Sequence, residues 1–266
     1  MPDLKEIKEF IIEWNEVNTA DYYEASDQIW ENPELSMQEY KSSQTLINLL
    51  EKAGFEVEKA VAGMPTAFIA SYGSGKPVIG INCEYDALPG LSQEREKLEK
   101  APVKQGAPGQ GCGHNLLGTA GVKAAAAIKE VIEKFKLPGT VKVIGAPAEE
   151  LCLGKPFLGK AGYLSGYDAF LDWHPWNYTK VNYDSCQAYM SVKYHFTGRT
   201  CHGNSPWHGR SALDAAMLQG HAVEIMREHM YPGCPPDAAN TINYTFVTTG
   251  PEFPSVVPDY TTAWYI

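Results

Sequence analysis

The chain has 266 residues, of which 44% are hydrophobic and 20% are charged, and its formal net charge at pH 7 is −10. This apolar content is enough to form buried cores, which excludes a disordered chain. The basic residues are scattered under a net negative charge, which argues against a nucleic-acid partner, and no apolar run approaches the roughly 20 residues of a membrane-spanning helix.

Cysteine usage and the first residues indicate the compartment. The six cysteines do not have the spacing of a small disulfide scaffold. Acidic residues occur among the first six positions, where a secretory signal peptide needs basic and apolar ones. We therefore expect reduced thiols and a cytoplasmic protein.

Helical patterns occupy the first fifty residues. Apolar residues at helical spacing predict a first helix that includes Ile7, Phe10 and Trp14, and a second helix from Tyr22 to Trp30 that ends before a proline. Ser36 and Glu39 have the spacing of a capping box, with Ser36 as the N-cap. This pattern predicts a third helix that begins here and ends at Gly54.

Strands then alternate with helices and loops. Strands are predicted at residues 67–72, 78–83, 140–145 and 169–173, and a long helix follows His114 as far as Phe135. The continuous apolar run at 78–83 is typical of a strand that is buried on both faces of an α/β sheet. Because open α/β sheets bind ligands at the C-terminal ends of their strands, the polar residues just past these strands are candidate site residues.

The pattern changes after Tyr178. An alternating segment at 188–196, an amphipathic helix at 211–229 and strands at 241–248 and 260–266 predict a β-α-β-β order. This order is typical of a small antiparallel domain with a helix on one face. We place the boundary between residues 184 and 185, which gives an α/β domain over 1–184 and a second domain over 185–266.

Cys112 and His114 are separated only by Gly113. Residues two apart cannot share a helical face, but around a glycine in a tight loop both side chains can turn toward one ion. A thiolate and an imidazole suit zinc, manganese or iron. The pair alone is a weak indication, because a cysteine is most often a small buried apolar residue.

Carboxylates and a further histidine strengthen the metal hypothesis. Glu149 and Glu150 follow an apolar strand, so they are either a solvated pair that opens a helix or a metal ligand beside a general base. His174 is either a packed histidine or a third or fourth ligand. A thiol-protease centre fits less well, because it leaves the two glutamates unexplained. The predicted sheet brings six candidates to one edge, which favours the metal site: Asp86, Cys112, His114, Glu149, Glu150 and His174.

Four segments in chain order resemble the dinuclear metallo-amidohydrolases of the aminoacylase and carboxypeptidase family. They are EYDALPGLSQ at 84–93, GCGHNLLGTA at 111–120, WHP at 173–175 and GRSALDA at 209–215. Within that family they are similar to the branch of auxin-conjugate hydrolases, hippurate hydrolases and the aminobenzoyl-glutamate hydrolase B subunit. The resemblance covers essentially the whole chain. It implies a zinc-peptidase-like α/β catalytic domain, with a mostly parallel mixed sheet flanked by helices, and a small ferredoxin-like α+β dimerisation or lid domain.

The resemblance also implies roles for individual residues. Cys112 would bridge two divalent metal ions, manganese or zinc, and His114, Glu150 and His174 would be further ligands. Glu149 would deprotonate the bridging water and then protonate the leaving amine, while Asp86 would orient a ligand. His202, in the segment GRTCHGNSP at 198–206, would reach the active site of a partner subunit and stabilise the oxyanion or hold the substrate carboxylate.

The implied reaction is hydrolysis of the amide between an acyl or aroyl group and an amino acid with a free carboxylate. A dipeptidase or carboxypeptidase of the same family shares this chemistry, and a non-catalytic module that binds metal or dimerises is a third hypothesis. Family members are longer than this chain, so we expect both domains to be incomplete at the C-terminus and one more histidine ligand to be absent. A homodimer through the lid domain is the implied assembly, with a second, different subunit as the alternative.

Overall fold

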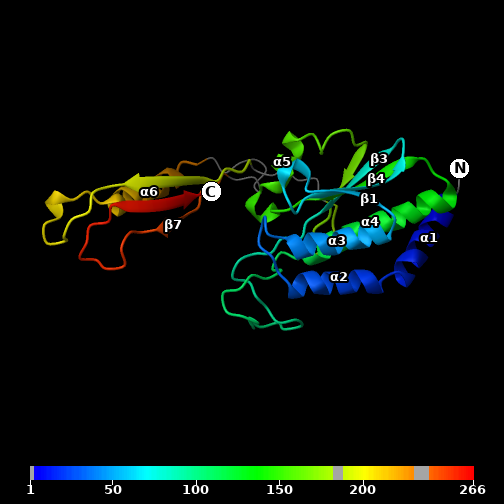
Figure 1. Ribbon diagram of the computed structural model, residues 1–266, viewed down its shortest axis with the longest axis horizontal. Coiled ribbons are helices and arrows are strands. Elements are labelled where there is room, and N and C mark those ends of the chain that lie inside the picture. Colours follow the sequence, from blue (N-terminus) through cyan, green and yellow to red (C-terminus); the bar gives the residue numbers. More distant parts are fainter. Residues whose placement is uncertain (1–2, 182–187, 231–239) are drawn as a thin grey trace. The chain divides into compact units, whose positions relative to one another are not determined.

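The computed structural model describes residues 3–181, 188–230 and 240–266 (Figure 1). The chain divides into two compact units, residues 1–179 and 180–266, and each is described by itself. The boundary that the sequence predicts, between residues 184 and 185, lies outside the described residues. Within the described ranges, no helix combines the length and the apolar character that crossing a bilayer requires.

A five-stranded mixed sheet forms the centre of the first unit, in the order β1-β2-β4-β3-β5. β3 is paired in parallel with both β4 and β5, while β2 is antiparallel to β1 and to β4, so only β2 runs against the other four strands. The strands are β1 (Glu56–Lys59), β2 (Phe68–Ser74), β3 (Val78–Cys83), β4 (Gly139–Gly145) and β5 (Ala169–Leu171). The predicted α/β class with a mostly parallel sheet is confirmed.

Helices cover both faces of this sheet (Figure 1). Phe68, Ile81 and Val143 pack on one face with Leu46, Leu50 and Val122 of the helices. Ile69 and Ile144 pack on the opposite face with Leu158. The first face carries α1 (Leu4–Val17), α2 (Ala20–Glu31), α3 (Tyr40–Lys52) and α4 (His114–Phe135), and the second carries α5 (Gly154–Lys160).

The capping box predicted for the third helix is wrong. α3 begins at Tyr40, and neither Ser36 nor Glu39 caps it with a side chain. Glu34 does so instead, because its carboxylate accepts hydrogen bonds from the backbone amides of Lys41 (3.0 Å) and Ser42 (2.8 Å). Met37 has a φ of 66°, and this left-handed residue turns the chain so that Ser36 and Glu39 reach residues at the edge of the sheet.

The second unit has a three-stranded antiparallel sheet in the order β6-β8-β7, with one helix on it. Its elements are β6 (Val192–Thr197), α6 (Ala212–Arg227), β7 (Tyr244–Thr248) and β8 (Tyr260–Tyr265). The β-α-β-β order is therefore the predicted one. Ser211 caps α6 by accepting a hydrogen bond from the amide of Asp214 (3.0 Å). The buried face of α6 consists of the small residues Ala212, Ala216 and Gly220. A Cβ at Gly220 would lie 3.1 Å from the Tyr244 hydroxyl.

Close packing of α4 on the sheet makes a first prediction. A Cβ at Gly121 would lie 2.5 Å from Cys83 Sγ and 3.0 Å from the Asn82 carbonyl oxygen. Overpacking costs about 1–3 kcal/mol, which outweighs the gain of about 1 kcal/mol in helix propensity. We expect Gly121→Ala to lower the free energy of unfolding in urea, whereas Ala124→Gly, at an exposed position of the same helix, should cost only the propensity difference. A Gly121→Ala protein more stable than wild type would contradict this packing.

Candidate metal centre

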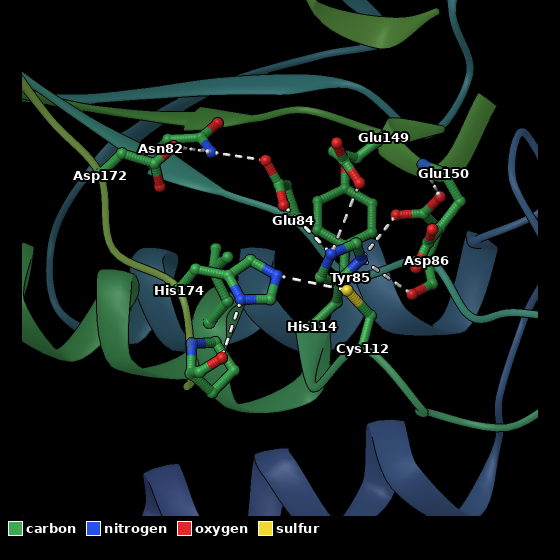
Figure 2. Close-up of polar contacts among 12 residues, drawn as sticks. Asn82, Glu84, Tyr85, Asp86, Cys112, His114, Glu149, Glu150, Asp172 and His174 are labelled. Carbon is green, nitrogen blue, oxygen red and sulfur yellow. Dashed lines mark hydrogen bonds and ion pairs between the residues drawn. The ribbon is translucent and has the colours of Figure 1, made fainter. Parts of the chain in front are cut away.

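The C-terminal ends of the parallel strands β3, β4 and β5 meet at one edge of the sheet, and α4 begins there. Leu88 and Gly109 exchange two backbone hydrogen bonds of 3.0 Å, which closes the intervening loop and returns the chain to this edge. Most of the side chains that the sequence predicts therefore lie close together (Figure 2): Asp86, Cys112, His114, Glu149, Glu150 and His174.

His114 is fully buried at the start of α4. Its Nδ1 lies 3.0 Å from Asp86 Oδ1 and 3.1 Å from the Asp86 carbonyl oxygen, so this nitrogen carries the proton. Burial lowers the pKa of His114, but the hydrogen bond and charge of Asp86 and the charge of Glu84 outweigh burial and raise it. The other ring nitrogen, Nε2, faces Glu84 Oε2 at 3.2 Å and Glu149 Oε2 at 3.7 Å.

The side chains of Cys112 and His174 are in direct contact. The Cys112 Sγ and His174 Nε2 atoms are 3.2 Å apart, and His174 Nδ1 lies 2.9 Å from the Pro175 carbonyl oxygen. Gly113 has a φ of 82°, and a Cβ there would lie 2.7 Å from Pro175 Cγ. Only glycine suits that position, because both the conformation and the space exclude a side chain. Burial and the negative charge of Glu150 raise the pKa of the Cys112 thiol to about 12.

Glu149 and Glu150 follow β4 in a short 3-10 turn, Glu149–Leu151. The backbone amide of Glu150 donates to Asp86 Oδ2 at 3.0 Å, and Ser36 Oγ donates to the same oxygen at 2.7 Å. Burial raises the pKa of both glutamates, and the charge of Glu84 raises that of Glu149 further. The hydrogen bonds that Asp86 accepts, from His114 first, outweigh the effect of its burial and lower the pKa of Asp86.

Sequence reasoning did not single out Glu84 as a site residue. Its carboxylate is buried, forms an ion pair with Lys155 of α5, and accepts a hydrogen bond of 2.9 Å from Asn82 Nδ2. Asn82 also donates to Asp172 Oδ2 at 3.2 Å, which ties β3 to the residue before Trp173 (Figure 2). The place of Glu84 two residues before Asp86, at the same strand end, was the available signal in the sequence.

This group of side chains fits a divalent cation. Cys112, His114 and His174 each offer a ligand atom within 4.8 Å of the others, and so do Glu84, His114 and Glu149. His114 Nε2 and Glu150 Oε1 are buried, and neither has a hydrogen-bond partner among the described residues, although Nε2 lies within ion-pair distance of Glu84. Such orphaned polar atoms are costly unless something satisfies them. Thiolate, imidazole and carboxylate are a donor set that zinc and manganese accept.

His202 belongs to the second unit, where it is exposed and forms an isolated bridge with Val256. Its Nδ1 accepts a hydrogen bond of 3.2 Å from the amide of Asn204. Its role stays a prediction. Of the cysteines, Cys83, Cys112, Cys152 and Cys201 are free, and Cys186 and Cys234 lie outside the described residues.

Comparisons with a family model and with curated proteins point to the same group of hydrolases. Residues 80–260 match the model of peptidase family M20/M25/M40. The B subunit of p-aminobenzoyl-glutamate hydrolase from Escherichia coli K12 is 39% identical over 255 residues, which are 96% of this chain and 52% of that protein. The Xaa-Arg dipeptidase of Homo sapiens is 30% identical over 256 residues, 89% of this chain and 52% of that protein. The chain thus spans about half the length of these curated relatives.

Two crystal structures share the fold. The aminobenzoyl-glutamate utilization protein from Klebsiella pneumoniae has a TM-score of 0.60 at 16% identity, with 97% of this chain and 68% of that chain covered. The Bacillus subtilis YXEP protein, a dinuclear metal-binding peptidase of the M20 family, has a TM-score of 0.54 at 22% identity, with 93% and 64% covered.

The Glu84–Lys155 pair gives a prediction for the metal-free protein. Lys155→Met would leave the buried Glu84 carboxylate without its cation. We expect the free energy of unfolding in urea to fall by about 2–3 kcal/mol, less than for a fully buried pair, because the Lys155 side chain is 37% exposed. Adding Glu84→Gln should restore most of the loss, and Lys160→Met, at an exposed position of α5, should change little. A Lys155→Met protein with the free energy of unfolding of the wild type would show that the Glu84–Lys155 pair does not stabilise the fold.

Proposed function

The chain belongs to peptidase family M20/M25/M40, and from this premise we propose a metal-dependent amidohydrolase that cleaves the amide between an acyl or aroyl group and an amino acid with a free carboxylate. The observation that carries the proposal is the cluster around His114, in which a thiol, two imidazoles and a carboxylate lie at one sheet edge and the buried Nε2 lacks a hydrogen-bond partner among the described residues. The similarity to the B subunit of p-aminobenzoyl-glutamate hydrolase supports the substrate class.

In this proposal Cys112, His114, Glu150 and His174 would hold two divalent ions. The mixed donor set suits manganese and zinc nearly equally, so the supply of each metal decides between them. When bound, the ions would supply positive charge that polarises the amide carbonyl and lowers the pKa of a water molecule.

The chain's own residues then handle the proton and the substrate. Glu149 takes the proton from water and passes it to the leaving nitrogen. Water and substrate can reach this carboxylate, because the Glu149 side chain is 34% exposed. Asp86 holds the Nδ1 proton of His114 and so keeps Nε2 facing the cluster. His202 donates a hydrogen bond to the oxyanion or to the substrate carboxylate.

A second candidate function is a dipeptidase or carboxypeptidase, and the 30% identity to the human Xaa-Arg dipeptidase favours it over other peptidases. The chemistry at the cluster is the same for both candidates. They differ in the group on the acyl side of the bond, which is an acyl or aroyl group in the first and an amino acid or a peptide in the second.

We also propose that two copies pair through the second unit. Large apolar side chains on α6 support this interface, since Met217, Leu218 and Ile225 are 56%, 69% and 56% exposed. A different kind of chain is the alternative occupant, because the Escherichia coli relative is named as the B subunit of its enzyme.

The metal roles predict a separation between binding and turnover. Purified protein loaded with manganese or zinc should bind two ions per chain and hydrolyse p-aminobenzoyl-glutamate. Glu149→Gln should lower kcat by about 10²–10⁴ with unchanged metal content, whereas Cys112→Ser and Glu150→Gln should bind metal more weakly. His202→Ala should lower kcat/KM without metal loss. One loose ion or none in the wild type would favour a non-catalytic module, and undiminished turnover in Glu149→Gln would exclude its role as the base.

A substrate panel separates the two candidate functions. We expect kcat/KM to be highest for amides with an aromatic acyl group and a free carboxylate, such as aminobenzoyl-glutamate, and lower for N-acetyl amino acids and Xaa-Arg dipeptides. The matched control is the α-amide of aminobenzoyl-glutamate, which removes the charge of the α-carboxylate and should be a poorer substrate. Preference for Xaa-Arg dipeptides would replace the amidohydrolase proposal with the dipeptidase.

Pairing through α6 predicts a dimer that a single charge disrupts. Leu218→Glu should shift the sedimentation coefficient from dimer to monomer, because a buried, unpaired carboxylate is costly at an interface. Glu228→Gln, just past the end of α6, serves as the control. Wild-type protein that sediments as a monomer at all concentrations would contradict the interface.

A further inference from the structure

The turn that carries Glu149 is held from both sides by buried carboxylates. The backbone amide of Ala148 donates to Glu39 Oε1 at 2.8 Å, and the amide of Glu150 donates to Asp86 Oδ2 at 3.0 Å. Ala148 has a φ of 54° and a ψ of 42°, a left-handed conformation that alanine disfavours. A residue in such a conformation persists only where its surroundings impose it. The directions of Glu149 and Glu150 therefore depend on these two hydrogen bonds.

Glu39 is fully buried, and its carboxylate is used on both oxygens. Besides Ala148, Oε1 accepts a hydrogen bond from the amide of Met37 at 2.8 Å, and Oε2 accepts one from Thr66 Oγ1 at 2.9 Å. Burying a carboxylate lowers the stability of the fold more than burying an apolar residue of the same size would. Packing alone therefore does not account for a glutamate at this position. The hydrogen bonds give it another purpose, because it joins three segments that are distant in sequence.

The segment around Glu39 also reaches the other carboxylate. Ser36 Oγ donates to Asp86 Oδ2 at 2.7 Å, the same oxygen that accepts the Glu150 amide. The backbone of this segment is fixed to the sheet edge, because the Ala87 amide donates to the Glu34 carbonyl oxygen at 2.8 Å. One short segment, residues 34–39, thus touches the turn directly through Glu39 and indirectly through Ser36 and Asp86.

We propose that Glu39 is a positioning residue for the Glu149–Glu150 pair. By holding the Ala148 amide, it fixes the left-handed residue from which both carboxylates project toward the cluster around His114. The proposal rests on the proposed function, since the pair serves there as base and metal ligand. Glu39 touches neither substrate nor metal in this role, and it acts only through the backbone of the turn.

The test compares Glu39→Leu and Glu39→Asp with Glu39→Gln. A glutamine can still accept from both amides and donate to Thr66, whereas leucine has no acceptor and aspartate is too short. Glu34→Leu is the matched control, because Glu34 lies in the same segment and, within the described part of the chain, its side-chain hydrogen bonds all go to α3. Two readouts apply to each protein: visible absorption during titration with cobalt(II), and amide hydrogen exchange at residues 148–150 in the metal-free state.

We expect Glu39→Leu and Glu39→Asp to bind cobalt about 10–100-fold more weakly than wild type, with an altered spectrum and faster exchange at Ala148. Glu39→Gln should stay within about threefold of wild type and keep its spectrum. Glu34→Leu should unfold more easily but keep the wild-type affinity and spectrum. Should Glu39→Leu fail to fold, Glu39→Asp decides the question.

The proposal is overturned if Glu39→Asp matches wild type in all readouts, or if Glu34→Leu weakens cobalt binding as much as the Glu39 variants do. Failure of the proposed function gives a different result, namely a wild-type protein that binds no cobalt. In that case the exchange rate at Ala148 still decides whether Glu39 holds the turn.

Discussion

The edge of the sheet depends on one electrostatic constraint, which is the gathering of carboxylates around a single buried imidazole. Asp86 lies on the Nδ1 side of His114, and Glu84 and Glu149 lie on the Nε2 side. Groups of like charge repel strongly in a buried place unless positive charge is near. Lys155 supplies positive charge to Glu84. The raised pKa of His114 favours its positively charged form between Asp86 and Glu84. A divalent cation would meet the same need with more charge.

Several local features of the fold bring these groups together. Gly113 passes so close to Pro175 that a side chain could not fit, which sets Cys112 against His174. Ala148 is held in a disfavoured conformation by a carboxylate more than a hundred residues away in sequence. The left-handed conformation of Ala148 costs free energy locally, and the packing of the two sheet faces offsets that cost. Such local costs are common where a protein holds a site ready for a ligand.

The sequence was informative where the signal is local. The continuous apolar run of β3 and the glycine between Cys112 and His114 predicted both the sheet and the cluster at its edge, because strand order places the reactive residues together. It was uninformative where a contact spans the chain. Glu84 pairs with a lysine 71 residues away, and nothing near either residue indicates this. Ser36 and Glu39 suit a helix cap as well as they suit long-range hydrogen bonds, since both arrangements use the same side chains. The tertiary contact decided between them.

X-ray absorption at the metal edge of zinc- or cobalt-loaded protein tests most directly whether the thiol and imidazoles around His114 hold a cation. The geometry of the cluster predicts a sulfur neighbour at about 2.3 Å and nitrogen neighbours at about 2.0–2.1 Å, with the sulfur lost in Cys112→Ser. A shell of oxygen and nitrogen alone in the wild-type protein, unchanged by Cys112→Ser, would show that the metal binds elsewhere.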